Sequence, residues 1–143
     1  MILVDANLLL YAYNASAEDH AKAKEWLEAV LSGAEPVALC WPVILAFLRI
    51  TTNPRAFPHP LSRTEAAMIV SEWLDQPQTV LIGPGLNHWG ILQRTLSEGK
   101  ASGPLVSDAH LAALAVEHGA TLYSTDRDFA RFPKMKLENP LED

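Results

Sequence analysis

Four aspartates lie where short apolar segments end or where a helical segment begins: Asp5, Asp108, Asp126 and Asp128. Asp5 follows the apolar run 2–4, and Asp126 follows the segment 122–125. Open α/β folds bind ligands at the carboxyl ends of their strands, so acids that follow different strands can meet at one edge of a sheet. Carboxylates without His or Cys companions suit Mg²⁺ or Mn²⁺ rather than zinc. The spacing therefore indicates a divalent-metal site.

Hydrolysis of a phosphodiester is the reaction that most needs such a site. Packed carboxylates raise one another's pKa, and a divalent cation relieves that repulsion. The cation also lowers the pKa of a bound water and neutralises charge on the phosphate. Each acid taken singly has a structural alternative, because aspartate is common at helix N-termini and in turns. That alternative is weaker when it must explain three separate sites at once.

Apolar runs and turn residues predict strands that alternate with helices. The predicted strands are 1–5, 37–40, 79–82, 121–124 and 135–137. The predicted helices are 6–13, 16–33, 42–50, 62–75, 87–98 and 107–119, followed by a short helical turn at 126–132. The predicted N-caps are Ser16, Ser62 and Ser107. Because crossover helices imply parallel strands, we predict an α/β fold: a single three-layer α/β/α domain, 1–143, with a mainly parallel sheet of four or five strands.

The composition is that of a globular protein with a sizeable core. Of the 143 residues, 49% are hydrophobic and 20% are charged. The apolar runs are far shorter than the roughly 20 residues of a membrane span. The first residues lack the basic segment that opens a signal peptide, and the single cysteine, Cys40, allows no intrachain disulfide. These features predict a cytoplasmic protein.

Charge is distributed unevenly along the chain. The net charge of -6 argues against a general nucleic-acid binder, because Lys and Arg drive phosphate binding. However, no acid lies between residues 36 and 64, a window that holds Arg49, Arg55 and Arg63. A second basic group lies near the C-terminus and comprises Arg127, Arg131, Lys134 and Lys136. These local patches could accept a phosphate backbone beside the acids, although solvated surface positions explain them equally well.

Motifs for other chemistries do not occur in the sequence. The five histidines show no H-E-x-x-H spacing, and there is no G-x-S-x-G elbow or G-x-x-x-x-G-K phosphate loop. A haloacid-dehalogenase-type phosphatase also begins with an aspartate after its first strand, but Asn7 replaces the second aspartate that its chemistry needs. The remaining conspicuous side chains are interpreted as packed rather than reactive: Trp26, Cys40, Trp73 and His118.

Four segments of the chain resemble motifs of the PIN-domain ribonucleases. Residues 2–12 resemble their opening motif, residues 107–115 the third acidic motif and residues 124–129 the fourth. The middle segment 47–55 is similar to one branch of the VapC toxins of bacterial toxin–antitoxin pairs. The segments occur in the expected order, and the resemblance runs essentially from end to end.

The resemblance implies a PIN-like fold and a Mg²⁺-dependent endoribonuclease, with Mn²⁺ as an alternative ion. It also implies a homodimer that a VapB-type antitoxin silences. By position, Asp5, Asp108 and Asp126 would bind the metal, and Asp128 would be a further acid beside it. Asn7 would form a hydrogen bond next to the ligands. The basic residues expected to steer the RNA backbone are Arg49, Arg55 and Arg127.

One position departs from the family pattern. PIN domains usually carry a glutamate in the third helix, and the corresponding residue here is Ala46. The expected consequence is three firm ligands plus Asp128, with poor retention of a second metal ion. The missing glutamate also supports a non-enzymatic alternative, a degenerate domain that only binds RNA or a protein partner.

Overall fold

The computed structural model describes residues 1–142. Within them the strands are β1 (Ile2–Val4), β2 (Val37–Leu39), β3 (Thr79–Leu81), β4 (Thr121–Tyr123) and β5 (Lys136–Glu138). The α-helices are α1 (Ala6–Tyr13), α2 (His20–Leu31), α3 (Trp41–Thr51), α4 (Arg63–Asp75), α5 (His88–Glu98) and α6 (Leu105–His118). A short 3₁₀ helix, η1 (Arg127–Arg131), follows β4.

The chain adds strands on one side of β1 first and then on its other side. The strand order is β3-β2-β1-β4-β5, and all neighbouring strands are parallel. Ile2 pairs with Val37 on one side and with Thr121 on the other. The chain therefore adds strands outward to β3 and then crosses back to β4. Such a reversal leaves a crevice outside the carboxyl ends of the two central strands, β1 and β4.

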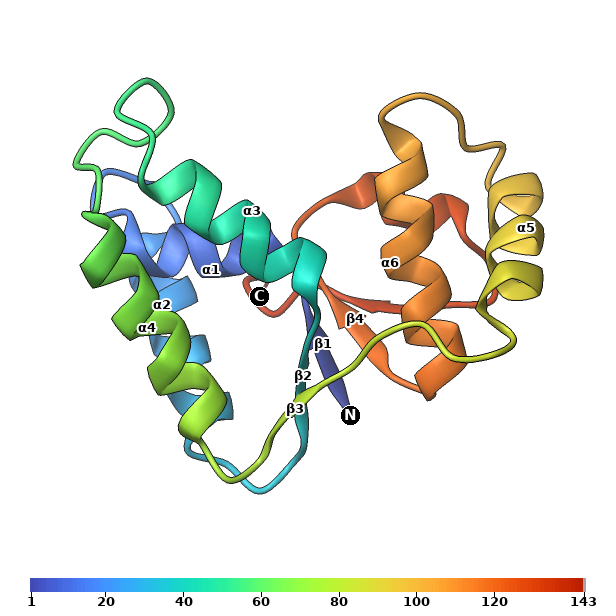
Figure 1. The fold of residues 1–143 in the computed structure, drawn as a ribbon, viewed down its shortest axis with the longest axis horizontal. Coiled ribbons are helices and arrows are strands. Elements are labelled where there is room, and N and C mark those ends of the chain that lie inside the picture. Colours follow the sequence, from blue (N-terminus) through green and yellow to red (C-terminus); the bar gives the residue numbers. More distant parts are fainter. Residues whose placement is uncertain (143) are drawn as a thin grey trace.

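The helices form two layers that cover the two faces of the sheet. Figure 1 shows α1 to α4 on one side of the strands and α5 with α6 on the other. Right-handed crossovers require this division, because the connections before and after the reversal run in opposite directions along the sheet. Leu3, Val4 and Leu122 are fully buried, as expected for strands covered on both faces. The predicted three-layer α/β/α architecture and the mainly parallel sheet are confirmed.

An aromatic cluster joins α1, α3 and α4. The rings of Phe47 and Trp73 lie 4.6 Å apart in an edge-to-face arrangement, and Trp73 Nε1 donates a hydrogen bond to Tyr13 Oη at 3.1 Å. Trp73 is 2% exposed, which confirms its predicted place in the core. Trp26 is only partly buried and stacks on Tyr123 at 5.6 Å.

Two predicted helix starts are wrong, and both errors have a local cause. The side chain of Asn14 accepts a hydrogen bond from the amide of Ser16, so this segment forms a turn and α2 begins only after Asp19. α6 begins two residues before Ser107, because Pro104 already has helical dihedral angles (φ −59°, ψ −24°).

Other local predictions hold, with one exception. Ser62 caps α4 as predicted, in a complete capping box with Glu65. Trp89, which its spacing places on one side of α5 with Leu92 and Leu96, is 63% exposed, whereas those two leucines are partly buried. No helix within residues 1–142 is both long enough and apolar enough to cross a lipid bilayer.

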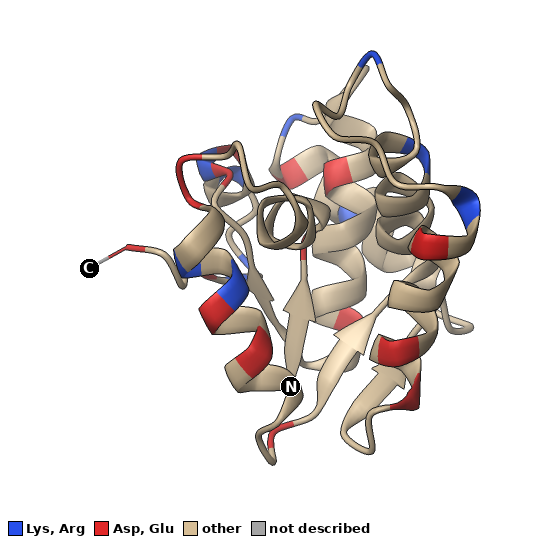
Figure 2. Ribbon diagram, turned by 90° about the vertical axis from the view of Figure 1, so that its left-hand side faces the viewer, with Lys and Arg blue, Asp and Glu red and all other residues tan. Residues whose placement is uncertain are grey.

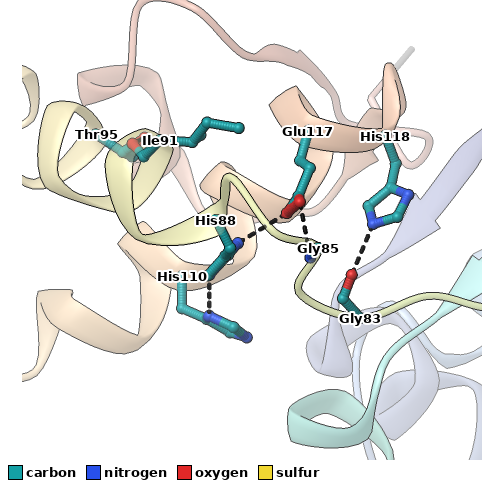
Figure 3. A network of polar contacts seen from close by, with 8 residues as sticks. All are labelled: Gly83, Gly85, His88, Ile91, Thr95, His110, Glu117 and His118. Carbon is teal, nitrogen blue, oxygen red and sulfur yellow. Dashed lines mark hydrogen bonds and ion pairs between the residues drawn. The ribbon is translucent and has the colours of Figure 1, made fainter.

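Polar contacts attach the connection between β3 and α5 to α6 (Figure 3). The Glu117 carboxylate accepts hydrogen bonds from the amide of Gly85 at 2.8 Å and from Nδ1 of His88 at 2.9 Å. His88 Nε2 lies 3.1 Å from Nδ1 of His110. His118 contacts the carbonyl oxygen of Gly83 at 2.8 Å, so its predicted packing role is confirmed. The contacts hold the start of α5 against the helix that carries Asp108.

Replacing Glu117 with Gln is expected to lower the free energy of unfolding by about 1 kcal/mol at pH 7. Burial alone would raise the pKa of Glu117, but the hydrogen bonds from His88 and Gly85 lower it below the usual 4.5. An acid with a lowered folded-state pKa stabilises the protein above its unfolded pKa and loses that contribution as the pH falls through the folded value. The stability difference between parent and variant, measured by urea unfolding, should therefore shrink below about pH 4.5. A difference that is constant with pH would contradict this assignment.

Candidate metal centre

Asp5 lies at the carboxyl end of β1, where it both caps a helix and lines the crevice. One carboxylate oxygen, Oδ1, accepts a hydrogen bond from the amide of Ala6 at 2.8 Å and caps α1. The other oxygen, Oδ2, accepts one from Ser124 Oγ at 2.7 Å. Burial raises the pKa of Asp5, and the charge of Asp126 adds to this, although the two hydrogen bonds partly offset the rise. The helix-cap explanation of Asp5 is correct, and it does not exclude a role in the site.

Ser124 connects the two central strands. Its hydroxyl donates to Asp5 Oδ2 and accepts a hydrogen bond from the amide of Asp126 at 3.0 Å. The side chain is 1% exposed, so water does not compete for these contacts. Sequence reasoning did not assign Ser124 a role. The available signal was a small hydroxyl residue between the end of β4 and the following acid.

Asp126 and Asp128 occupy the turn that begins η1. Asp126 is the N-cap of η1, and its Oδ1 accepts a hydrogen bond from the amide of Asp128 at 2.9 Å. This contact leaves the other oxygen of Asp126 without a hydrogen bond from residues 1–142. Asp128 is exposed beside it. The turn thus explains both residues locally and places two acids shortly after the end of β4.

Asp108 lies in the first turn of α6, in the electrostatic field of the other acids. Burial raises its pKa, and the charges of Asp126, Asp5 and Asp128 add to the rise in that order. Only the charge of Arg131 acts in the opposite direction. Three segments that lie far apart in the sequence therefore place their carboxylates in one electrostatic neighbourhood. Its excess negative charge, with oxygen as the sole donor type, fits a hard divalent cation.

These side chains do not form a closed coordination shell. Within residues 1–142, no three Asp, Glu, His or Cys side chains converge closely enough to hold one ion as they stand. Asn7 is half-buried on α1, and its side chain forms no hydrogen bond with the described part of the chain. Ala46, in the place of the usual glutamate, adds no oxygen from α3. The acids lie in one electrostatic field. The side-chain hydrogen bond that orients Asp5 comes from Ser124 rather than from Asn7.

Basic residues gather on the side of the molecule to which the strands point. In Figure 2 most blue segments lie in the upper half, including the loop between α3 and α4, where red segments also occur, and the lowest part shows red segments without blue ones. Arg49 at the end of α3 and Arg55 in that loop are both exposed. Arg127 is also exposed, with Nη2 3.7 Å from a carboxylate oxygen of Glu142. The edge that carries the acids is thus flanked by cations, despite the net charge of -6.

Replacing Ser124 with Ala should weaken metal binding about tenfold, the lower end of the range for residues that orient metal ligands. The variant leaves Asp5 Oδ2 and the amide of Asp126 without their shared partner. Mg²⁺ binding can be followed by the rise in melting temperature with ion concentration. Ser124→Thr keeps the hydroxyl and should restore binding, and Ser97→Ala on the exposed face of α5 should change nothing. Equal Mg²⁺ affinity in Ser124→Ala and the parent would exclude a positioning role.

Comparison with known proteins identifies the family. Residues 2–135 match the family model of the PIN domain. Ribonuclease VapC37 of Mycobacterium tuberculosis is 46% identical over 140 residues, covering 98% of this chain and 97% of that protein. VapC ribonuclease Mb2897 of Mycobacterium bovis is 38% identical over 142 residues, covering 99% of this chain and 97% of that protein.

A solved toxin–antitoxin complex from Klebsiella pneumoniae contains a chain of the same fold, with a TM-score of 0.67 at 19% identity and coverage of 98% of both chains. The family match extends over all the segments that carry the resemblance, from the strand before Asp5 to η1. It leaves no support for the haloacid-dehalogenase-type alternative. The chain belongs to the PIN-domain family, among the VapC ribonucleases.

Proposed function

We propose that this chain is a Mg²⁺-dependent endoribonuclease and the toxin of a toxin–antitoxin pair. The observation that carries the proposal is the field shared by Asp5, Asp108 and Asp126 at the switch point of the sheet. Burial and mutual repulsion raise the pKa of two of these acids, so their negative charge is unfavourable until a cation neutralises it. The relatives named ribonuclease, at 46% and 38% identity, support the choice of RNA as substrate.

The ion would be held by Asp5, Asp108 and Asp126, with water and a phosphate oxygen completing the coordination that a hard cation requires. Mg²⁺ suits this all-oxygen donor set, and Mn²⁺ is the natural substitute. When bound, the ion supplies charge neutralisation at the phosphate and a lowered pKa for a coordinated water. Because Ala46 contributes no carboxylate, we propose that one ion is bound firmly and a second only weakly.

The chain's own residues would supply positioning and proton transfer. Asp128 is exposed beside Asp126, so a carboxylate oxygen of either acid can orient the attacking water and accept its proton. Asn7, half-buried in the first turn of α1, would hydrogen-bond beside the ligands once the site is filled. The residues proposed to steer the RNA backbone are Arg49, Arg55 and Arg127.

A cleavage assay with the purified protein tests the proposal. End-labelled single-stranded RNA should be cut internally in millimolar Mg²⁺ or Mn²⁺ and should remain intact in EDTA. RNA binding without cleavage in either metal would instead support the degenerate domain suggested by Ala46 and by the open arrangement of the acids. Absence of both binding and cleavage would contradict the proposed function altogether.

The proposed partners are a VapB-type antitoxin and a second copy of the chain. The antitoxin is suggested by the structural neighbours, which include a toxin–antitoxin complex from Klebsiella pneumoniae. An arginine of the antitoxin could pair with the acidic cluster and so quench it. Co-expression with a cognate VapB-type antitoxin should yield a stable complex with reduced cleavage, and light scattering on the free protein should report a dimer. A cytoplasmic location, where RNA is present, belongs to the same proposal.

A further inference from the structure

Lys100 holds a backbone conformation that is unfavourable for its residue type. It follows α5 and its C-cap Gly99 with a φ of 48°, and no other non-glycine residue within 1–142 has a positive φ. The amide of Ala101 donates to the carbonyl of Leu96 at 2.9 Å, and the amide of Lys100 donates to the carbonyl of Ser97 at 3.2 Å. This helix-ending turn normally has glycine in the left-handed position, because a Cβ there crowds the backbone.

The chain itself shows the ordinary solution at its next helix. α6 ends with Gly119 in the left-handed conformation, with a φ of 63°. At the end of α5 the glycine comes one residue earlier, because a Cβ on Gly99 would lie 2.4 Å from Cε1 of Phe132. Packing therefore explains Gly99 but leaves the lysine in the next position unexplained. The side chain of Lys100 is exposed and forms no hydrogen bond or ion pair with the described residues, so no contact within the fold offsets the strain.

The segment that contains the strained residue lies on the side of the molecule to which the strands point. The connection between α5 and α6 is at the top of Figure 1, on the side to which the strands point, and it leads directly into the helix turn of Asp108. Arg131 Nη1 donates a hydrogen bond to the carbonyl of Gly99 at 3.1 Å, and the same guanidinium opposes the rise in the pKa of Asp108. Lys100 therefore directly follows Gly99, whose carbonyl accepts a hydrogen bond from Arg131, and Arg131 lies in the electrostatic field of Asp108.

We propose that Lys100 binds a phosphate of the RNA, and that the left-handed turn presents its ammonium group from the loop that leads into the helix of Asp108. An ammonium is a compact point charge that suits a phosphate. The acids repel the RNA phosphates on both sides of the bond to be cut. Cations on the neighbouring loops are therefore needed to retain the RNA strand. With Arg55 on the α3–α4 loop, Lys100 would give the strand a cation on each side of the acids. This inference rests on the proposed ribonuclease function.

The test measures RNA binding and its salt dependence. A fluorescein-labelled single-stranded RNA of 12 nucleotides and mixed sequence is titrated in EDTA, with Asp5→Asn present in every protein to prevent cleavage. Lys100→Ala should weaken binding about fivefold at 0.1 M salt and reduce the slope of log affinity against log salt by about 0.7, the value for one single-strand phosphate contact. Lys100→Arg should retain both. Lys24→Ala removes the same charge from the exposed face of α2, outside both basic groups, and should leave the slope unchanged.

A second variant separates charge from strain. Lys100→Gly should raise the melting temperature by about 2–4 °C, because glycine tolerates the left-handed conformation, while binding RNA as weakly as Lys100→Ala. A parent that cleaves RNA, paired with a Lys100→Ala protein that keeps its affinity and salt slope, would overturn this inference and leave the proposed function standing. A parent that neither binds nor cleaves RNA would overturn both.

Discussion

Replacing Asp5 with Asn is expected to reduce metal-dependent RNA cleavage by at least about 100-fold while making the metal-free protein more stable. Asn caps helices as well as Asp does, so the hydrogen bond from the amide of Ala6 is kept. The amide nitrogen can donate to Ser124 in place of the present bond. What disappears is a charge that burial and Asp126 disfavour. The melting temperature in EDTA should rise by about 2–5 °C.

The pH dependence follows from the same pKa. The folded-state pKa of Asp5 lies above its usual 3.8, so the folded protein binds this proton more tightly than the unfolded chain does. The destabilising effect of the ionised group therefore appears as the pH rises from 3.8 through the folded value and persists at neutral pH. Asp5→Asn should show its stability advantage at pH 7 and lose it in acid.

Added Mg²⁺ should reverse the order of the two melting temperatures, so that the parent becomes more stable than Asp5→Asn. Ligand binding to the folded state raises the melting temperature of the parent by mass action, and Asp5→Asn should respond little. Asp19→Asn is a matched control, because Asp19 also precedes a helix but forms no side-chain capping bond. It should behave as the parent does in Mg²⁺. An Asp5→Asn protein that cleaves RNA at the parental rate would refute the assignment of Asp5 as a ligand.

Replacing Gly99 with Ala should destabilise the protein by about 2–3 kcal/mol, since overpacking a core contact forces the backbone or the ring to move. The added Cβ would lie 2.4 Å and 2.5 Å from two atoms of the Phe132 ring, which is itself 3% exposed. The ring follows η1, so its displacement should also move Asp126 and weaken Mg²⁺ binding. Urea unfolding and the Mg²⁺-dependent melting shift measure the two effects.

A glycine-to-alanine substitution within α5 itself should have the opposite effect on stability. Gly90 lies inside that helix with no atom within 4 Å of an added Cβ. Gly90→Ala should stabilise the protein by about 0.5–1 kcal/mol through helix propensity alone. Combining Gly99→Ala with Phe132→Leu should recover part of the lost stability, because the smaller side chain makes room. Equal effects of the two glycine substitutions would show that contact with Phe132 is not the cause.

Sequence patterns that span only a few residues are enough to predict the architecture. Apolar runs bounded by turn residues located the strands, and the crossover rules then required parallel pairing and helices on both faces. Asp5 and Asp126 could be placed at one edge of the sheet because both follow strands whose carboxyl ends point the same way. The predicted starts of α2 and α6 are wrong because of local interactions. The side chain of Asn14 forms a turn before α2, and the helical dihedral angles of Pro104 let α6 begin before Ser107.

Only the tertiary structure decided how the acids are organised. Ser124 reaches Asp5 across 119 residues, and this contact exists because β1 and β4 are neighbours in the sheet. The contact of Gly99 with Phe132, and with it the strained turn at Lys100, likewise depends on how η1 packs beside the end of α5. Propensity and capping act over one or two helical turns, so they determine which residues stand at segment ends. Contacts between distant segments follow from strand order and packing, which no local pattern in the sequence encodes.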